Sequence, residues 1–251
     1  MHDRVLTLDG GHNFRDLGGY RTAGGRLTKW RKLFRSGSTS SLSAAGYERL
    51  STLELKAICD FRSTSERERN PNELPRLGVL TYWARDYNQS LGNLHALLSS
   101  QHTTPQEARE TMLEIYRGLP VEQAPAYRQL FRLLAEDEVP LVFNCSGGKD
   151  RTGLAAALIL SALGASDDVV LEDYLLSNTA LGAGQPDKGY AALKISAEVA
   201  RVIGGTSADF LDAAFGAIRA MSGSVSGYLR EELGVTPDML ERIQESLLEA
   251  R

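Results

Sequence analysis

One segment near the middle of this 251-residue chain restricts its folds more than any other. Residues 140–144 form a short apolar run typical of a buried strand, and the small-residue loop 145–149 follows directly. Residues 152–163 are rich in alanine and leucine, which predicts a helix ending at Gly164. Because a buried strand that turns through glycines into a helix is a unit of α/β proteins, we expect an α/β fold.

Other apolar and helical patterns extend this prediction over the chain. Strands are expected at 5–8, 56–61 and 79–83, and a hairpin over 20–34 that turns at 23–25. Helices are expected at 44–53, 108–119, 124–136 and 166–177, and then over most of the remaining chain. Pro71 and Pro75 argue against a regular element beside them. We expect one domain, residues 1–251, with a central mostly parallel sheet flanked by helices and a helical C-terminal third.

The composition excludes several function classes. A hydrophobic fraction of 42% with 24% charged residues indicates a folded globular protein. The net charge of -4 provides no global attraction for nucleic acid or anionic lipid, so an anion site must build its positive potential locally. No apolar run approaches the roughly 20 residues of a membrane span, and residues 1–5 lack the apolar stretch of a signal peptide. With two cysteines and no disulfide framework, a cytoplasmic location is expected, with export independent of a signal peptide left open.

The loop after residue 144 has the chemistry of an anion cradle. Gly147 and Gly148 allow the backbone to curl with its N–H groups facing inward, and a helix N-terminus follows. Arg151 can place its planar fork on two oxygens of a tetrahedral oxyanion. The expected phosphate-binding residues are therefore Ser146, Gly147, Gly148, Lys149, Asp150 and Arg151.

Cys145 lies at the base of this cradle and is the expected nucleophile. The inward N–H groups should stabilise its thiolate, which could then attack a bound phosphorus. Thr152 could donate a hydrogen bond to the sulfur and make it a better leaving group. A cysteine after a core strand is usually a small buried hydrophobe, but here strand, cysteine, glycines, arginine and helix coincide. A nucleotide P-loop fits poorly, because Gly148-Lys149 is followed by Asp150, and a rhodanese-type sulfurtransferase would not need Asp150, Arg151 and Thr152 together.

The segment 145–153 (CSGGKDRTG) resembles the signature Cys-x5-Arg-[Ser/Thr] of the protein tyrosine phosphatase superfamily. With Lys149 and Asp150 it is similar to a bacterial branch known from mycobacterial and listerial phosphatases. Further matches lie at 13–20 (NFRDLGGY), 33–37 (LFRSG), 60–63 (DFRS), 173–178 (DYLLSN) and 227–229 (GYL). The resemblance implies a tyrosine phosphatase-like fold and a cysteinyl-phosphate intermediate, with no metal or other cofactor. It implies phosphotyrosine as substrate, with phosphoserine, phosphothreonine or phosphoinositides as further candidates.

The chain departs from this family at Asn144, where a histidine normally precedes the cysteine. Asparagine can donate to loop carbonyls, but it carries no charge. The thiolate should therefore be less strongly stabilised, and the pH optimum higher. Gly147 replaces the usual alanine, which should soften the loop.

Phosphoryl transfer also needs a general acid, and three aspartates are candidates. Asp150 ranks first, because it lies within the loop and the resemblance points to it. Asp60 ranks second, because it ends a strand expected beside that of Cys145. Asp86 ranks third, because it follows the strand 79–83. The alternatives are that Asp150 orients Arg151 or caps the helix, that Asp60 pairs with Arg62, and that Asp86 is a surface carboxylate.

Four other features need an interpretation. Lys149 is either a solvated lysine or a contact for a second phosphate or a lipid headgroup. Cys59 is expected to be a core cysteine facing away from Asp60, with a protective disulfide to Cys145 as the alternative. Residues 105–136 correspond to a helical lid or insert in the mycobacterial relative, but a place in the core is preferred. We prefer to interpret most of the charged residues Arg15, Asp16, Arg35 and Arg62 as members of structural pairs that lie behind the loop.

The expected partners are phosphorylated proteins or small phosphomonoesters, with phosphoinositides as a further class. Two rival functions remain: a phosphatase acting mainly on phosphoinositides, and a non-catalytic phosphate-binding module, which Asn144 motivates. Neither requires nucleic acid or a membrane span.

Overall fold

The computed structural model describes residues 3–72, 74–78, 81–87, 102–180 and 195–250. Its centre is a five-stranded sheet of order β1-β2-β5-β3-β4. The strands are β1 (Arg15–Asp16), β2 (Leu33–Ser36), β3 (Ala57–Asp60), β4 (Thr81–Ala84) and β5 (Leu141–Asn144). All neighbouring pairs are parallel except β1 with β2, so the prediction of a mostly parallel sheet is confirmed.

The strand β5 lies at the centre and sets the position of the loop that follows it. Asn144 is in register with Ser36 of β2 on one side and with Asp60 of β3 on the other. Parallel strands end at the same edge of a sheet, where ligands of α/β proteins usually bind. Residues that follow β2, β3 and β5 therefore meet around Cys145.

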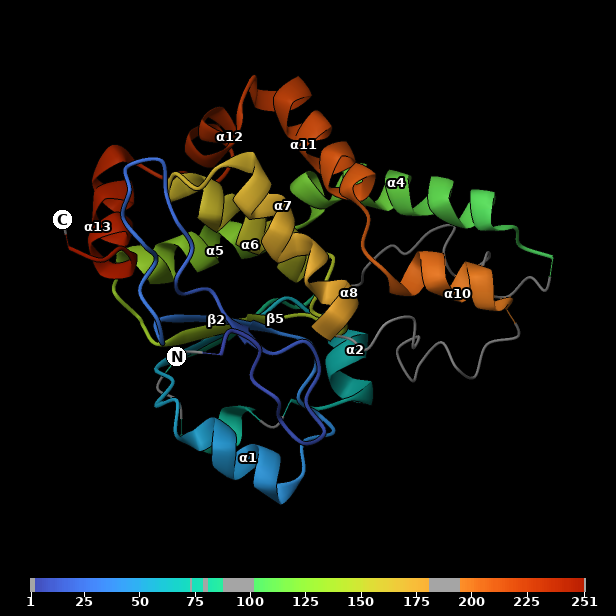
Figure 1. The fold of residues 1–251 in the computed structure, drawn as a ribbon, viewed down its shortest axis with the longest axis horizontal. Helices are drawn as coiled ribbons and strands as arrows, with labels where there is room; N and C mark the ends of the chain where they lie inside the picture. The colour runs from blue at the N-terminus through green and yellow to red at the C-terminus, as the bar shows by residue number, and fades with distance from the viewer. Residues whose placement is uncertain (1–2, 73, 79–80, 88–101, 181–194, 251) are drawn as a thin grey trace.

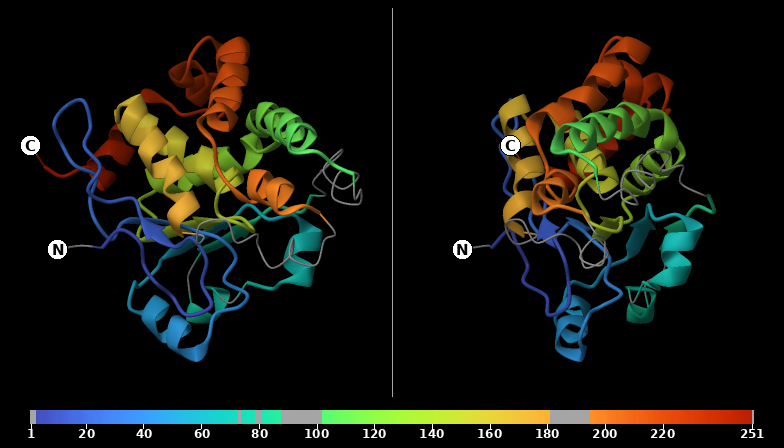
Figure 2. Two further views of the ribbon diagram at one scale, coloured as in Figure 1. Left: turned by 45° about the vertical axis from the view of Figure 1, so that its right-hand side comes forward. Right: turned by 90° about the vertical axis from the view of Figure 1, so that its right-hand side faces the viewer.

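Helices cover both faces of the sheet unequally, as Figures 1 and 2 show. Below it in Figure 1 lies α1 (Ala44–Ser51), while α2 (Thr64–Arg69) follows β3 at one end of the sheet. The larger layer above it holds α4 (Pro105–Glu122), α5 (Ala124–Ala135), α6 (Arg151–Ala162), α7 (Asp167–Leu175), α8 (Ser177–Ala180), α10 (Ala197–Gly204), α11 (Ala208–Ser222), α12 (Val225–Glu231) and α13 (Pro237–Leu247). The described C-terminal residues are thus helical, as expected. None of the described helices is long and apolar enough to cross a membrane.

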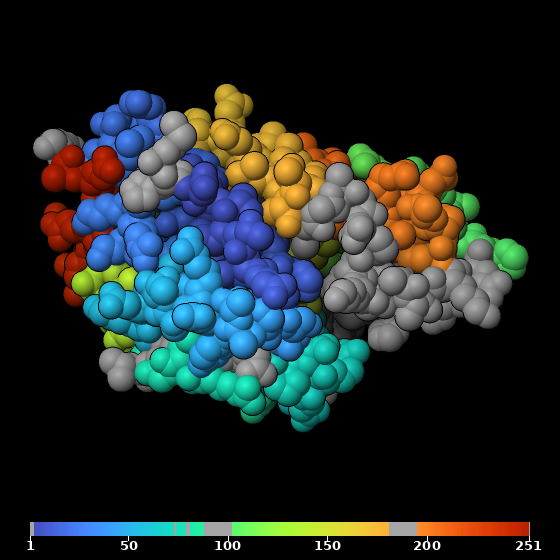
Figure 3. Space-filling model, turned by 60° about the horizontal axis from the view of Figure 1, so that its bottom comes forward, coloured from blue at the N-terminus to red at the C-terminus, as the bar shows by residue number. Residues whose placement is uncertain are grey.

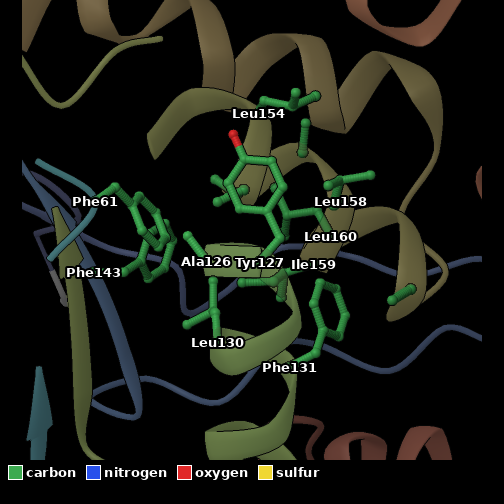
Figure 4. Packing of buried hydrophobic residues seen from close by; sticks show 14 of the residues in the cluster. Phe61, Ala126, Tyr127, Leu130, Phe131, Phe143, Leu154, Leu158, Ile159 and Leu160 are labelled. Atoms are coloured by element: carbon green, nitrogen blue, oxygen red, sulfur yellow. The ribbon is translucent and has the colours of Figure 1, made fainter. Parts of the chain in front are cut away.

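Alternating side chains of the strands build two hydrophobic clusters. Phe143 and Phe61 belong to the larger cluster, where they face Tyr127 and Leu130 of α5 (Figure 4). Helix α6 is buried almost all round, which explains its continuous run of alanine and leucine. Val142 points to the other face, into a smaller cluster with Leu50 of α1. The N-terminal segments and α1 cover much of that face (Figure 3).

The structure corrects several predicted elements. Residues 5–8 make an isolated bridge from Val5 to Arg15 and no strand. The expected hairpin is reduced to a bridge between Arg21 and Leu27, and β2 pairs with β1 instead. A short 3₁₀ helix, Leu74–Leu77, includes Pro75, and α4 continues through Pro120, because proline removes only one donor from a helical turn. The helix α2 was not predicted at all.

The segment 105–136, expected as core or lid, consists mainly of α4 and α5. Their buried side chains include Met112, Tyr116 and Leu119, which belong to the main core. This burial favours the core interpretation. The extent of the phosphatase domain over residues 1–251 stays a prediction, as does a lid.

Candidate active site

The loop after β5 can close only because residue 148 is glycine. Gly148 has a φ of 67°, and a Cβ there would lie 2.4 Å from the Gly37 nitrogen and 2.5 Å from the Ser36 carbonyl carbon. A Cβ on Gly147 would meet only Lys149, at 3.6 Å. The backbone of residue 148 is therefore pressed against the end of β2, whereas Gly147 has ordinary space.

Two buried side chains hold the loop from behind. Arg35 Nη2 donates to the Gly148 carbonyl at 2.7 Å, and Asn13 Nδ2 donates to the same oxygen at 2.9 Å. In a trans peptide the N–H points opposite to the carbonyl. Fixing this carbonyl therefore turns the Lys149 N–H the other way, which is how an anion cradle is built.

A single carboxylate, that of Asp173, organises this support. It pairs with Arg15 at 3.2 Å and with Arg35 at 2.5 Å, and it accepts from the Tyr20 hydroxyl at 2.9 Å. Burial would raise the pKa of Asp173, but the charges of both arginines and these hydrogen bonds hold it at about 2. The segments 13–20, 33–37 and 173–178 thus meet at one buried ionic cluster behind the loop. Arg15 and Arg35 have the scaffold role expected from the sequence.

The predicted phosphate clamp, Arg151, is held by a residue that the sequence analysis missed. Its Nη1 donates to Glu66 Oε2 and its Nη2 donates to Glu66 Oε1, both at 2.7 Å, in an end-on bidentate pair. Nη1 also donates to the Phe61 carbonyl at 3.1 Å and to the Tyr87 hydroxyl at 3.2 Å. No described residue accepts a hydrogen bond from Nε. The edge formed by Nε and Nη2 is therefore the one left for two oxygens of an oxyanion.

Glu66 also caps the first turn of the helix α2 and contacts the loop. Its Oε2 accepts from the Ser63 N–H at 2.7 Å, completing a capping box, and its Oε1 accepts from the Ser146 hydroxyl at 2.6 Å. Burial would raise the pKa of Glu66, but hydrogen bonds and charge from Arg151 lower it to about 2. The sequence does contain the signal, because Ser63 followed three residues later by Glu66 is a capping-box pattern.

Asp60, the second candidate acid, is fully buried and surrounded by donors. Arg62 donates to both of its oxygens, and the Tyr82 hydroxyl donates to Oδ2 at 3.0 Å. The expected pairing of Asp60 with Arg62 is present, at 2.8 Å. We expected Asn144 to donate to loop carbonyls, but no such hydrogen bond is present in the described part of the chain. The Asn144 amide donates to Asp60 Oδ1 at 3.3 Å, because β3 and β5 place the two residues in register.

Asp150, the first candidate acid, lies at the start of α6 with its side chain 28% exposed. It makes no capping hydrogen bond to that helix. Lys149 Nζ donates to both of its oxygens, at 2.7 and 2.9 Å, and the Tyr116 hydroxyl donates to Oδ1 at 2.6 Å. Lys149 is 5% exposed, so the interpretation as a solvated lysine is wrong.

The remaining candidates differ in their surroundings. Asp86 has an 88% exposed side chain that pairs with Arg67 at 2.6 Å, which fits a surface carboxylate. The Thr152 hydroxyl is buried and has no hydrogen-bond partner in the described part of the chain, so its expected bond to the Cys145 sulfur is not formed. Cys145 is 1% exposed, and both cysteines are free. Cys59 is in register with Phe143 in the core, and burial, followed by the charge of Asp60, raises the pKa of its thiol. The preferred interpretation of Cys59 as a core cysteine is thus confirmed, and the protective disulfide to Cys145 stays an untested alternative.

Comparisons with known proteins identify the family of this chain. The family model described as "Tyrosine phosphatase family" matches residues 6–249. A Cupriavidus necator protein, provisionally named a tyrosine-protein phosphatase, is 38% identical over 93% of this chain and 85% of its own length. The "Triple specificity protein phosphatase PtpB" of Mycobacterium tuberculosis is 30% identical over 97% of this chain and 99% of its own length. The chain therefore belongs to the tyrosine phosphatase family.

Proposed function

We propose that this phosphatase hydrolyses phosphotyrosine and related aryl phosphomonoesters through a phosphate ester on Cys145, without a metal. The observation that carries the proposal is the clamp arginine: Glu66 occupies one edge of Arg151 and leaves the Nε/Nη2 edge for substrate. A guanidinium fixed in this way is already oriented for the equatorial oxygens of phosphorus.

In the first step the Cys145 sulfur attacks phosphorus while the bond to the leaving oxygen breaks. Backbone N–H groups of residues 146–151 and Arg151 stabilise the equatorial oxygens. Asp150 gives a proton to the leaving oxygen. In the second step Asp150 takes a proton from water, which attacks phosphorus and releases the sulfur. Thr152, whose hydroxyl has no described partner, would donate to that sulfur.

The surroundings of the two carboxylates support Asp150 over Asp60 as the acid. Asp60 has no exposed surface, and Arg62 and Tyr82 donate to its carboxylate. Asp60 also accepts from the amide of Asn144, so its carboxylate links the ends of β3 and β5. Asp150 is partly exposed and adjoins the clamp arginine, so it can reach a leaving group.

A wider specificity is a second candidate, because one relative carries the name of a triple specificity phosphatase. Lys149 would be the contact for a second phosphate, but in this structure both Asp150 oxygens engage its ammonium group. We therefore propose aryl phosphates as the main substrates and phosphoinositides as secondary ones. Loss of phosphoinositide turnover alone in Lys149→Ala would reverse this order. Two free cysteines fit a cytoplasmic location, which we propose as well.

The test is hydrolysis of an aryl phosphate in EDTA over a pH series, for the wild type and Cys145→Ser. We expect turnover in the wild type and none in the variant, with a phosphorylated cysteine trapped after rapid acid quenching. An inactive wild type that still binds phosphate analogues would instead indicate a binding module.

A further inference from the structure

Two buried tyrosines lie directly behind Asp150. Tyr116 of α4 and Tyr174 of α7 both have 0% exposure. The Tyr174 hydroxyl donates to the Tyr116 hydroxyl at 2.7 Å, and the Tyr116 hydroxyl donates to Asp150 Oδ1 at 2.6 Å. The hydrogen bonds therefore run in one direction and end on the carboxylate.

The rings of this pair are fixed by packing. Tyr116 stacks on Phe210 with centroids 5.5 Å apart and meets Tyr174 edge to face at 6.3 Å. The Tyr174 ring also packs against Gly153, where a Cβ would lie 3.1 Å from it. Burial, more than the nearby charge of Asp150, raises the pKa of both phenols, so both hydroxyls keep their protons.

The position of the Asp150 carboxylate depends on these tyrosines because its own helix does not hold it. Asp150 is the N-cap residue of α6, yet its side chain accepts nothing from the α6 backbone. Its other described partner is Lys149, which reaches it through a flexible four-carbon stem. Tyr116 is thus the rigid contact that sets the direction of the carboxylate.

We propose that Tyr116 is a positioning residue that makes Asp150 Oδ2 the atom carrying the catalytic proton, and that Tyr174 fixes the direction of the Tyr116 hydroxyl. The reason lies in the number of protons. Each hydroxyl has one proton to donate, and that of Tyr116 is directed at Oδ1. Oδ1 also accepts from Lys149 Nζ at 2.7 Å, whereas Oδ2 accepts from Lys149 Nζ alone among the described residues, at 2.9 Å. Oδ2 therefore faces fewer donors, and we place the acid proton there. This proposal rests on the proposed function, in which Asp150 is the general acid.

The proton then follows one route in both steps. As the sulfur–phosphorus bond forms, the electron pair of the broken P–O bond passes to the leaving oxygen, which takes the proton from Oδ2. The carboxylate that remains is stabilised by the Tyr116 hydroxyl. In the second step water attacks phosphorus and gives a proton to Oδ2, and the electron pair of the P–S bond returns to sulfur.

The test uses Tyr116→Phe, which keeps the ring and removes only the hydroxyl. We expect kcat/KM to fall about tenfold for phenyl phosphate, whose leaving group needs the proton, and less than about threefold for a nitrophenyl phosphate. In Asp150→Asn the same contrast should be larger, and adding Tyr116→Phe to it should cost almost nothing further. Tyr174→Phe should change kcat/KM in the same direction by less.

Tyr228→Phe is the matched control, because the Tyr228 hydroxyl is also buried against α4 but donates to the Pro120 carbonyl at 2.6 Å. Its kcat/KM should stay within about twofold for every leaving group. An equal loss for all leaving groups in Tyr116→Phe, or additive losses in the double variant, would overturn the proposal. The proposed function fails separately, and this proposal with it, if the wild type has no turnover or Cys145→Ser keeps it.

Discussion

At the scale of single residues, the loop depends on contacts made from outside it. Gly148 is pressed against the end of β2, and Arg151 is oriented by Glu66 from the beginning of α2. The signature 145–151 therefore supplies the reacting groups, while residues distant in sequence supply their geometry. Two predictions separate these contributions.

The two loop glycines should respond in opposite ways to alanine. Gly148→Ala would place a methyl group 2.4 Å from a backbone nitrogen at a positive φ, so we expect a stability loss of about 2 kcal/mol or more and at least about 100-fold lower kcat/KM. Gly147→Ala meets no closer contact than 3.6 Å. It should keep its activity and gain about 0.5 kcal/mol from a stiffer unfolded chain. Urea unfolding and kcat/KM of both variants check this, and equal effects would contradict it.

Glu66→Gln should weaken the clamp without removing any loop residue. The ion pair with Arg151 becomes a neutral contact that no longer fixes both Nη atoms, so we expect kcat/KM to fall about 10- to 100-fold. Binding of inorganic phosphate, measured as a competitive inhibitor, should weaken as well. Glu68→Gln, an exposed residue of the same helix, is the control and should behave as the wild type.

At the scale of elements, α2 links helix capping to catalysis. The same carboxylate that closes the capping box with Ser63 also holds Arg151. A change at the first residues of this helix should therefore affect the position of Arg151, although no hydrogen bond joins Ser63 to Arg151 in the described part of the chain.

Ser63→Ala removes the hydroxyl that accepts from the Glu66 N–H. We expect a loss of about 1 kcal/mol in stability, together with a severalfold lower kcat/KM because Glu66 is less well placed. The matched control is Thr104→Ala, which breaks an equivalent capping box at the start of α4. That variant should lose similar stability and keep its kcat/KM. If both variants lost activity to a similar extent, the loss in Ser63→Ala would not come from a displaced Glu66, and the prediction would be contradicted.

The elements also show how far the sequence could predict this protein. The signature, the strands β3 and β5 and the helix α6 follow local patterns that need no knowledge of neighbours. Glu66 and Tyr116 are missing from the prediction because their roles come from contacts 85 and 34 residues away in sequence. Asn144 was assigned the wrong partner because strand register, invisible in one sequence, decides that it faces Asp60.

At the scale of the whole molecule, two carboxylates with low pKa values hold the site together. Glu66 has a pKa of about 2 in place of 4.5, and Asp173 a pKa of about 2 in place of 3.8. Each depressed pKa contributes stability that is complete above the unfolded value and is lost as pH falls through the folded one.

We therefore expect the free energy of unfolding to decline from about pH 4.5 toward pH 2, with Glu66 contributing on the order of 3 kcal/mol. Urea unfolding at several pH values would measure this decline. In Glu66→Gln the stability at neutral pH should be lower and the acid slope shallower. An unchanged slope would mean that Arg151 does not hold this carboxylate in solution.

The position of Asp173 has a consequence for how the protein is made. During synthesis the ribosome delivers Cys145 and Arg151 before Asp173, so a growing chain carries the complete signature before its support exists. Until Asp173 arrives, Arg15 and Arg35 lack their shared counter-charge and repel each other, so Arg35, one of the two side chains that donate to the Gly148 carbonyl, is not held in place. We therefore expect a chain that ends before Asp173 to carry the complete signature and yet to have much lower phosphatase activity than a chain that includes Asp173.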